Sequence, residues 1–323
     1  MLSNVTSVFS RYFVVGFFLP PFFGLVVLWQ TLSGAFPPNR LKYGDAGDVA
    51  VIGAGALLVA LVLSGSYAPI LSFLEGDLQA GPLRLVFGRL FRRWKRKGLQ
   101  RRQELLTDRE TATSSIRKLE VAKSVFADAG DAVSEDLDKQ LAEARADRAH
   151  AERLLTRYFP GGDRDLVPTR LGNTVSAWQS RVYKRWALDP YAVGAHVKQL
   201  LTEQERDRHA EAETNAAFFV NSSIVAALVA IAYVCDSVAY RHWYEAWWVV
   251  AAYLAYFLYT MAVGAAARYG DEISASIDLH RFDLYSRFGL REPSSRKAEL
   301  EFGEAINAVV LEGGTIRDLS RRS

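Results

Sequence analysis

The sequence predicts an all-α protein in which a four-helix transmembrane bundle carries a cytoplasmic helical domain. The first observation behind this prediction is that four long stretches contain no Asp, Glu, Lys, Arg or His, namely residues 12–32, 49–74, 216–235 and 246–267. The hydrocarbon core of a bilayer is about 30 Å thick, and about 20 apolar helical residues cross it. Because lipid offers the backbone no hydrogen bonds, apolar stretches of this length are expected to be helical.

The second observation is the uneven distribution of positive charge. Of the 39 Lys and Arg residues, 26 lie in residues 75–215 and nine in residues 268–323, whereas the short loops 33–48 and 236–245 together contain three. Loops rich in Lys and Arg stay on the cytoplasmic side of a membrane. We therefore expect a multi-pass protein of the cell (plasma) membrane, with both termini in the cytoplasm.

These two patterns divide the chain into four parts. The first and third parts are transmembrane hairpins, the second is a cytoplasmic helical domain that begins with a basic helix, and the fourth is a cytoplasmic tail. The parts are residues 1–75, 76–214, 215–267 and 268–323.

Two prolines, Pro20 and Pro21, interrupt the first predicted span. Neither can donate a backbone hydrogen bond, and each ring clashes with the preceding turn of a helix. A kinked helix that packs on its neighbours is the simpler interpretation, and an unwound or re-entrant segment that lines a cavity is the alternative. Residues 33–35 also resemble a signal-peptide cleavage site, but a single preceding basic residue, Arg11, and the long proline-containing stretch argue against cleavage.

Few polar residues lie inside the predicted spans. Asn221 is the largest of those in the third span, and it precedes a stripe of small residues formed by Ser222, Ala226 and Ala230. Small and amide side chains favour close packing between membrane helices, and a pore lining is the alternative. The spans contain no Asp, Glu, Lys, Arg or His, which disfavours proton-coupled transport.

A strongly basic segment follows the second predicted span. Residues 78–103 contain no acidic residue, and apolar side chains such as Leu83, Phe91 and Trp94 are interleaved with the basic ones. This pattern predicts an amphipathic helix, which is either an ordinary cytoplasmic flank or a specific site for anionic lipid headgroups. Its position next to the membrane disfavours nucleic acid as the ligand. The basic residues assigned to lipid binding are Arg84, Arg89, Arg92, Arg93, Lys95, Arg96, Lys97, Arg101 and Arg102.

Residues 104–158 predict an antiparallel, coiled-coil-like hairpin of two helices. Apolar residues recur at alternating spacings of four and three, and Gly130 interrupts the pattern. Because several charged residues also occupy the seam, the hairpin is expected either to be simply solvated or to bind a second copy or another protein. The residues assigned to self-association are Leu137, Leu141 and Leu155.

Signatures of catalysis are missing from the sequence. Asp278, His280 and Asp283 could suggest a metal or acid–base site, but their spacing in a helix favours packing. Gly172-Asn173 predicts a turn rather than a phosphate-binding loop. The lone cysteine, Cys235, excludes an intrachain disulfide and is expected to be a small core residue. We therefore expect no cofactor and no metal, and an enzyme is the function class that the sequence supports least.

Three segments together resemble a group of uncharacterised four-span membrane proteins from bacteria, largely actinobacteria. They are residues 168–173 (Pro-Thr-Arg-Leu-Gly-Asn), 185–189 (Arg-Trp-Ala-Leu-Asp) and 278–284 (Asp-Leu-His-Arg-Phe-Asp-Leu). In that group the second segment more often reads Arg-Tyr-Gly-Leu-Asp, so Trp186 and Ala187 depart from the pattern. The resemblance covers about residues 165–290, and it implies the four-span topology but no activity.

The functional hypothesis is therefore a non-enzymatic, self-associating membrane scaffold or signalling component. Its expected partners are anionic lipid headgroups and a second copy or another protein bound through the cytoplasmic helices. An oligomeric channel or small-solute transporter is the alternative, and a membrane-bound enzyme is a remote one.

Overall fold

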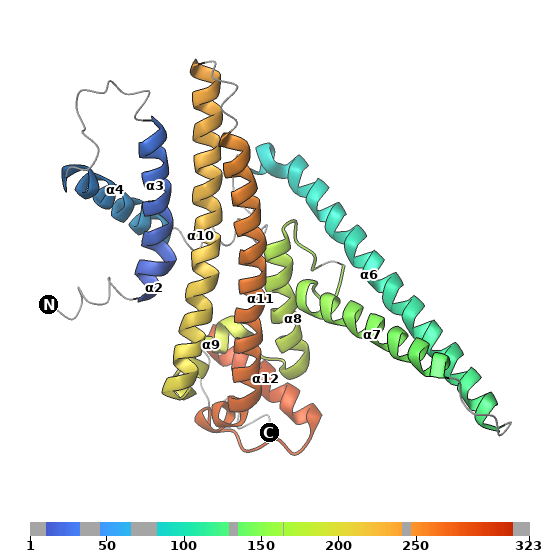
Figure 1. The fold of residues 1–323 in the computed structure, drawn as a ribbon. Coiled ribbons are helices and arrows are strands. Elements are labelled where there is room, and N and C mark those ends of the chain that lie inside the picture. Colours follow the sequence, from blue (N-terminus) through green and yellow to red (C-terminus); the bar gives the residue numbers. More distant parts are fainter. Residues whose placement is uncertain are drawn as a thin grey trace. The chain divides into compact units, whose positions relative to one another are not determined.

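The computed structural model of the chain confirms the predicted all-α class (Figure 1), because every regular element among the described residues is a helix and none is a strand. The chain forms two compact units. Unit 1 comprises residues 1–71 and 194–287, and unit 2 comprises residues 72–193 and 288–323. The structure describes residues 11–32, 46–65, 83–128, 135–163, 165–240 and 247–312.

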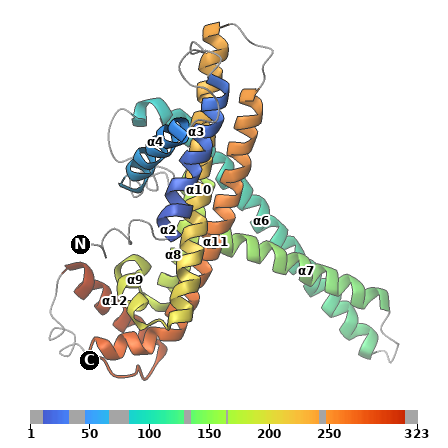
Figure 2. The same ribbon diagram turned by 60° about the vertical axis from the view of Figure 1, so that its left-hand side comes forward.

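The two longest helices of unit 1 contain the third and fourth predicted spans. Helix α10 (Glu203–Tyr240) has 38 residues and helix α11 (Trp247–Arg287) has 41, and the two pack side by side (Figure 2). Both are long and apolar enough to cross a membrane. At 1.5 Å per residue they are about 57 and 62 Å long, so each extends well beyond a bilayer core of about 30 Å.

The other two predicted spans form shorter apolar helices, so the structure does not confirm a four-span bundle. Their apolar helical lengths are Val14–Trp29 and Ala50–Gly65. Helix α4 (Ala46–Gly65) contains most of the second predicted span, and residues 66–74 of that span lie outside the described residues, as does the candidate cleavage site at 33–35.

The first span is helical throughout its described length, with a π-helical turn immediately before the two prolines. Helix α2 (Arg11–Phe13) leads into the π-helix η1 (Val14–Phe18) and then into α3 (Leu19–Leu32). The Leu19 amide donates to the Val14 carbonyl, five residues back, as in a π-helix. Because Pro20 and Pro21 have no N–H, the Gly16 carbonyl has no backbone donor in either the α or the π register.

All four apolar helical segments of unit 1 contribute to one core. Phe17 from η1, Ala60 from α4, Val225 from α10 and Ala251 from α11 belong to the same buried cluster. Close approach of helices at small residues supports this core, because a side chain at Gly24 in α3 would overlap Val225. Cys235, which we expected in a core, is instead exposed on α10.

The first described helix of unit 2 is α6 (Leu83–Asp128), which has 46 residues. The sequence predicted a basic helix up to residue 103 followed by a separate hairpin arm, but the structure joins the two without a break. Helix α7 (Glu135–Tyr158) packs against α6. The ion pairs Lys123–Asp138 (2.6 Å) and Glu120–Arg145 (2.8 Å) connect the two helices and show that they run antiparallel.

The remaining helices of unit 2 are α8 (Arg170–Trp186), α9 (Pro190–Leu200), whose first turns belong to this unit, and α12 (Arg296–Glu312). The prediction of a turn at Gly172-Asn173 is wrong, because both residues lie in the first turns of α8. The Thr169 hydroxyl accepts a hydrogen bond from the Gly172 amide (3.0 Å) and caps this helix. The Asn173 side chain accepts a second one from the Val167 amide (2.9 Å).

The corner between α8 and α9 is held by α12. Ala187 ends α8 in the left-handed conformation (φ 50°), which favours glycine and explains why an Arg-Tyr-Gly-Leu-Asp pattern would suit this position. Asn307 of α12 donates to the Ala187 carbonyl (2.7 Å) and accepts from the Asp189 amide (2.8 Å). One side chain therefore satisfies two backbone groups that no helix uses.

Candidate functional site

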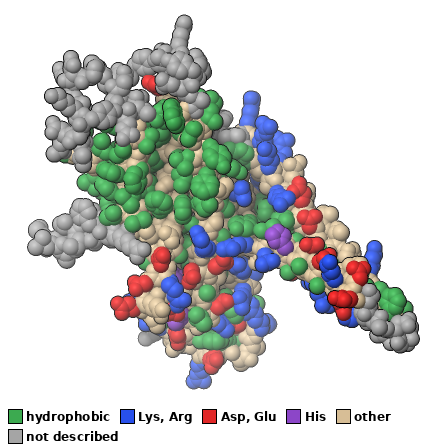
Figure 3. Space-filling view, viewed as in Figure 1, with side chains coloured by type: hydrophobic (Ala, Val, Ile, Leu, Met, Phe, Trp, Pro, Cys, Tyr) green, Lys and Arg blue, Asp and Glu red, His purple; other side chains and the backbone are tan. Residues whose placement is uncertain are grey.

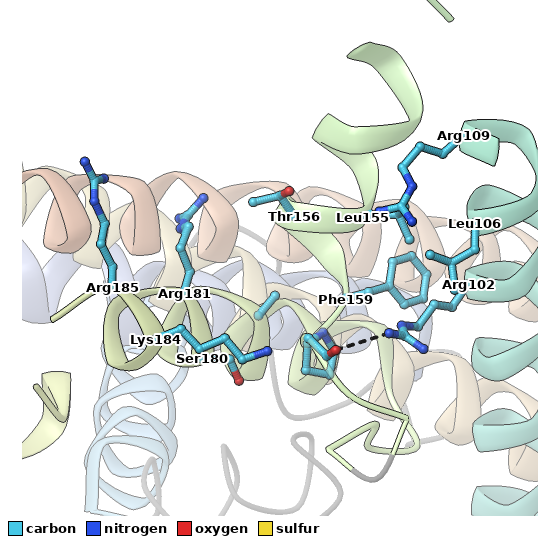
Figure 4. A pocket seen from close by; sticks show the side chains of 13 residues that line it. Arg102, Leu106, Arg109, Leu155, Thr156, Phe159, Ser180, Arg181, Lys184 and Arg185 are labelled. Atoms are coloured by element: carbon cyan, nitrogen blue, oxygen red, sulfur yellow. Dashed lines mark hydrogen bonds between the residues drawn. The ribbon is translucent and has the colours of Figure 1, made fainter. Parts of the chain in front are cut away.

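A basic pocket of about 430 Å³ lies between α6, α7 and α8 in unit 2. Five of its lining residues are cationic and none is acidic. Its apolar wall is formed by Leu106, Leu155 and Phe159, and Thr156 and Ser180 add hydroxyl groups. The cationic residues are Arg102, Arg109, Arg181, Lys184 and Arg185 (Figure 4).

Helix α8 supplies three of these cations, and it is held in place by a buried apolar face. Val175, Trp178 and Val182 are at most 7% exposed, and their spacing places them on one side of the helix. Arg181 and Arg185 are one helical turn apart and extend in the same direction in Figure 4. The amphipathic pattern that fixes α8 in unit 2 therefore also presents its basic residues to the pocket.

The segment after α7 brings backbone close to two of the cations. Arg102 donates to the Gly161 carbonyl (3.3 Å), the bond drawn in Figure 4, and forms an ion pair with Asp163. The Lys184 ammonium lies where a side chain at position 161 would be. Glycine at position 161 is therefore required for the ammonium to occupy this place.

The electrostatic consequence is a pocket that attracts anions. Within the described residues neither Arg109 nor Lys184 forms a salt bridge, and Asp163 pairs only with Arg102 among the cations of the lining. Positive charges gathered in one hollow repel each other and raise the local concentration of negatively charged ligands. Guanidinium groups also match the oxygen geometry of carboxylates and phosphates.

Of the five cations of this pocket, sequence reasoning assigned a binding role only to Arg102. The other four cations come from α6 and α8, and the approach of those helices depends on the tertiary packing. One signal was available, because Arg181, Lys184 and Arg185 have the spacing of a single helix face.

The predicted lipid-binding residues lie on the first half of α6. Arg89, Arg92, Arg93, Arg96, Lys97 and Arg101 are exposed, and Lys95 and Arg102 are half-buried. Phe91 is buried whereas Trp94 is 41% exposed. The side chain of Arg84 lies outside the described residues. Most of these cations are thus accessible to a charged surface.

The predicted self-association residues are used mainly within unit 2. Asp138 and Arg145 pair with α6, and Leu141, which shares their helix face, is buried. Leu137 is half-buried, and Leu155 lines the basic pocket. These three leucines therefore stabilise the hairpin and its surroundings and leave little apolar surface for a partner.

The predicted packing or pore residues lie at the contact between the first span and α10. Asn221 is fully buried and donates to the Gly16 carbonyl (2.7 Å), the group that the prolines leave without a backbone donor. Pro20 and Pro21 are buried, as are Ala226 and Ala230, and Ser222 is half-buried. The prolines and Asn221 thus form one arrangement, in which an amide side chain replaces the missing backbone donor.

The polar cluster near His280 connects α10 with α11. His280 Nε2 lies 3.2 Å from Glu205 of α10, and Nδ1 lies 3.5 Å from Asp283. Glu205 also accepts hydrogen bonds from the Thr202 amide and hydroxyl (both 2.8 Å), and these, followed by His280, lower its pKa to about 2. In the described part of the chain, no group of three His, Cys, Asp or Glu side chains could hold a metal ion.

A second histidine bridge lies nearby in unit 1. His209 of α10 is buried, and its Nε2 lies 2.6 Å from the Ser276 hydroxyl of α11. Burial lowers the pKa of His209 below 6.5, and Lys198 acts in the same direction, whereas Glu272 and Glu213 oppose the shift. The imidazole is therefore expected to be neutral in the folded protein at neutral pH.

This bridge predicts a loss of stability on mild acidification. Protonation in the unfolded chain begins near pH 6.5, whereas the folded protein resists it. The contribution of His209 should be fully present above pH 6.5 and be lost as pH falls from there toward the lower folded-state pKa. Thermal unfolding of the detergent-solubilised protein between pH 7.5 and 5 would measure it. His209→Gln should flatten this dependence, and an unchanged slope would contradict the prediction.

Neither a known protein family, nor a curated protein, nor a solved structure shows significant similarity to the chain. The functional argument therefore rests on the geometry described above.

Proposed function

We propose that the chain is a four-span membrane protein that works as a non-enzymatic, self-associating scaffold or signalling component. Its helical hairpin α6–α7 is the contact arm in this proposal. The observation that carries the proposal is an exposed apolar patch at the C-terminal end of α6. Ion pairs between α6 and α7 stabilise the helix pair that carries this patch.

The surface of unit 1 supports a membrane location. In the apolar stretches of α10 and α11 only 39% and 22% of the residues are buried. Large apolar side chains point outward there, among them Ile231 (58% exposed) and Tyr253 (70% exposed). Figure 3 shows hydrophobic side chains gathered over these helices and α3, with charged side chains on the lower parts of α10 and α11. So large an exposed apolar area is typical of a surface covered by lipid or protein.

The charge distribution supports the proposed orientation of the spans, and the apolar stretches support their number. The apolar core shared by the first span, α4, α10 and α11 supports a bundle of four helices. The proposed topology places both termini and residues 75–215 in the cytoplasm. A reporter fused after Ser323 should be cytoplasmic, and one fused within residues 36–44 should be external. A C-terminus on the outer side would contradict the topology.

The contact arm carries apolar residues that the hairpin itself does not cover. Val121 (59% exposed) and Val125 (60% exposed) lie one helical turn apart on α6, and Phe126 (46% exposed) is adjacent. Burial of each such side chain contributes about 1.5–3 kcal/mol. A second copy that presents the same face would cover this patch by two-fold symmetry.

Self-association is tested by the mass of the detergent-solubilised protein. Wild-type protein should form a defined oligomer, and replacement of Val121 and Val125 by serine should shift it toward the monomer. The matched control replaces Thr107 and Ser114, polar residues of the same helix, by alanine, and should leave the mass unchanged. A wild-type monomer at all concentrations would contradict the arm. Reproducible ion flux in liposomes would instead support a channel.

The basic first half of α6 is proposed to bind anionic lipid headgroups. Each exposed cation near an anionic leaflet contributes about 1 kcal/mol, and the interaction weakens with salt. A peptide of residues 83–103 should therefore bind anionic vesicles in a salt-dependent manner and ignore neutral ones. Equal binding to neutral vesicles would contradict an electrostatic site.

A further inference from the structure

We propose that the basic pocket of unit 2 binds a compact anion that carries two or more phosphate groups. This inference goes beyond the scaffold function and depends neither on the number of spans nor on self-association. It concerns a small ligand, whereas the lipid proposal above concerns the exposed surface of α6.

The charge of the pocket fits such a ligand. Five cations line it, the lining contains no carboxylate, and two of the cations, Arg109 and Lys184, form no salt bridge within the described residues. Two phosphate groups carry about three to four negative charges at neutral pH. A ligand with several phosphate groups can contact more than one of these cations at once, whereas a single carboxylate cannot, so a polyphosphate is the better match.

The chemistry of the cations fits phosphate oxygens. Four of the five cations are arginines, whose planar forks bind phosphate through two parallel hydrogen bonds. Arg109 comes from α6, and Arg181 and Arg185 come from α8, so two helices supply the guanidinium groups of the lining (Figure 4). Thr156 and Ser180 provide hydroxyl donors in the same lining.

The size and the apolar wall of the pocket define the rest of the ligand. A volume of about 430 Å³ lies within the range of about 300–1,000 Å³ that small-molecule sites occupy. Leu106 and Phe159 can pack against an apolar or ring-shaped part of the ligand. The shared chemistry is therefore a phosphate-rich head, which either a soluble polyphosphate compound or a phosphorylated lipid headgroup can supply.

Binding of inorganic tripolyphosphate to the full-length protein in detergent tests the site directly. Calorimetry should show binding, and the ligand should raise the unfolding temperature, because it binds only the folded state. The variant Arg109→Gln/Lys184→Gln removes two pocket cations that form no salt bridge within the described residues, and it should weaken binding at least about tenfold for each lost contact of 1.4 kcal/mol. Gly161→Ala should weaken it as well, because the new side chain displaces the Lys184 ammonium.

The matched control is Lys118→Gln/Arg170→Gln, which removes the same charge from the same two helices outside the pocket lining. It should keep wild-type affinity and unfolding temperature. A second arm uses vesicles of phosphatidylcholine with or without a phosphoinositide, and loss of binding in the pocket variant alone would identify a lipid headgroup as the source. Failure of both probes to bind, or equal losses in the pocket and control variants, would overturn the proposal. Binding of single-stranded nucleic acid without binding of tripolyphosphate or of phosphoinositide vesicles would also overturn the proposal.

Discussion

Replacement of Gly303 by alanine is expected to destabilise unit 2 by about 2–3 kcal/mol. Gly303 lies where α12 crosses the end of α8, and a Cβ there would overlap the Trp186 carbonyl and lie 2.9 Å from the Ala187 carbonyl carbon. These atoms are backbone and cannot rotate away, so the helices must separate. Insertion of atoms into a well-packed contact typically costs about 1–3 kcal/mol. Separation would also strain the two hydrogen bonds that Asn307 forms across this corner.

The expected measurement is a fall in unfolding temperature of about 5–10 °C, at roughly 2–4 °C per kcal/mol for a unit of this size. Hydrogen exchange should rise at residues 185–190 and 303–308. Gly88→Ala is the matched control, because open space surrounds that position on α6 and alanine favours a helix by about 1 kcal/mol. It should stabilise the protein slightly. Unchanged stability of Gly303→Ala would show that α12 does not approach α8 this closely.

Helix content was predictable because hydrophobicity and charge are strong local signals. The apolar lengths of α10 and α11 follow directly from their uncharged stretches. The first two predicted spans form shorter apolar helices within the described residues, so helix length supports their membrane assignment less strongly.

Boundaries between helices were harder to predict. The end of the basic segment at residue 103 suggests a boundary between a basic helix and a hairpin arm, yet α6 continues through it. It also continues through Gly88 and Gly98, since a single glycine costs a helix only about 1 kcal/mol. Gly172-Asn173 suggested a turn, but Thr169 three residues before the glycine was the stronger signal, because its hydroxyl caps α8.

The basic pocket could not be predicted because its parts are distant in the sequence. Arg102 and Arg181 are almost 80 residues apart, and only the packing of α6 and α8 with α7 brings them into one lining. The pairing of Asn221 with Gly16 is similar. The sequence singled out Asn221 and the two prolines separately, but the contact itself joins positions 205 residues apart. The prolines indicate which carbonyl lacks a backbone donor, but they do not indicate which side chain donates to it.

The contact between Asn221 and Gly16 gives the second large expected effect. Asn221→Ala leaves a fully buried carbonyl without a donor in apolar surroundings, which typically costs about 1–3 kcal/mol. Denaturant unfolding in detergent should show this loss. Ser222→Ala, at the adjacent half-buried position, is the control and should change stability by less than about 0.5 kcal/mol. Equal effects of the two substitutions would contradict a specific role for the amide.

A double-mutant cycle with Pro20 isolates the reason for this contact. Alanine at position 20 restores an N–H that can donate to the Gly16 carbonyl, four residues back, as in an α-helix. Asn221→Ala should then cost about 1 kcal/mol less in the Pro20→Ala protein than in the wild type, because the carbonyl has a backbone donor. Additive losses would mean that Asn221 acts through packing alone. A positive coupling energy would show that the amide of α10 substitutes for the donor that the proline removes.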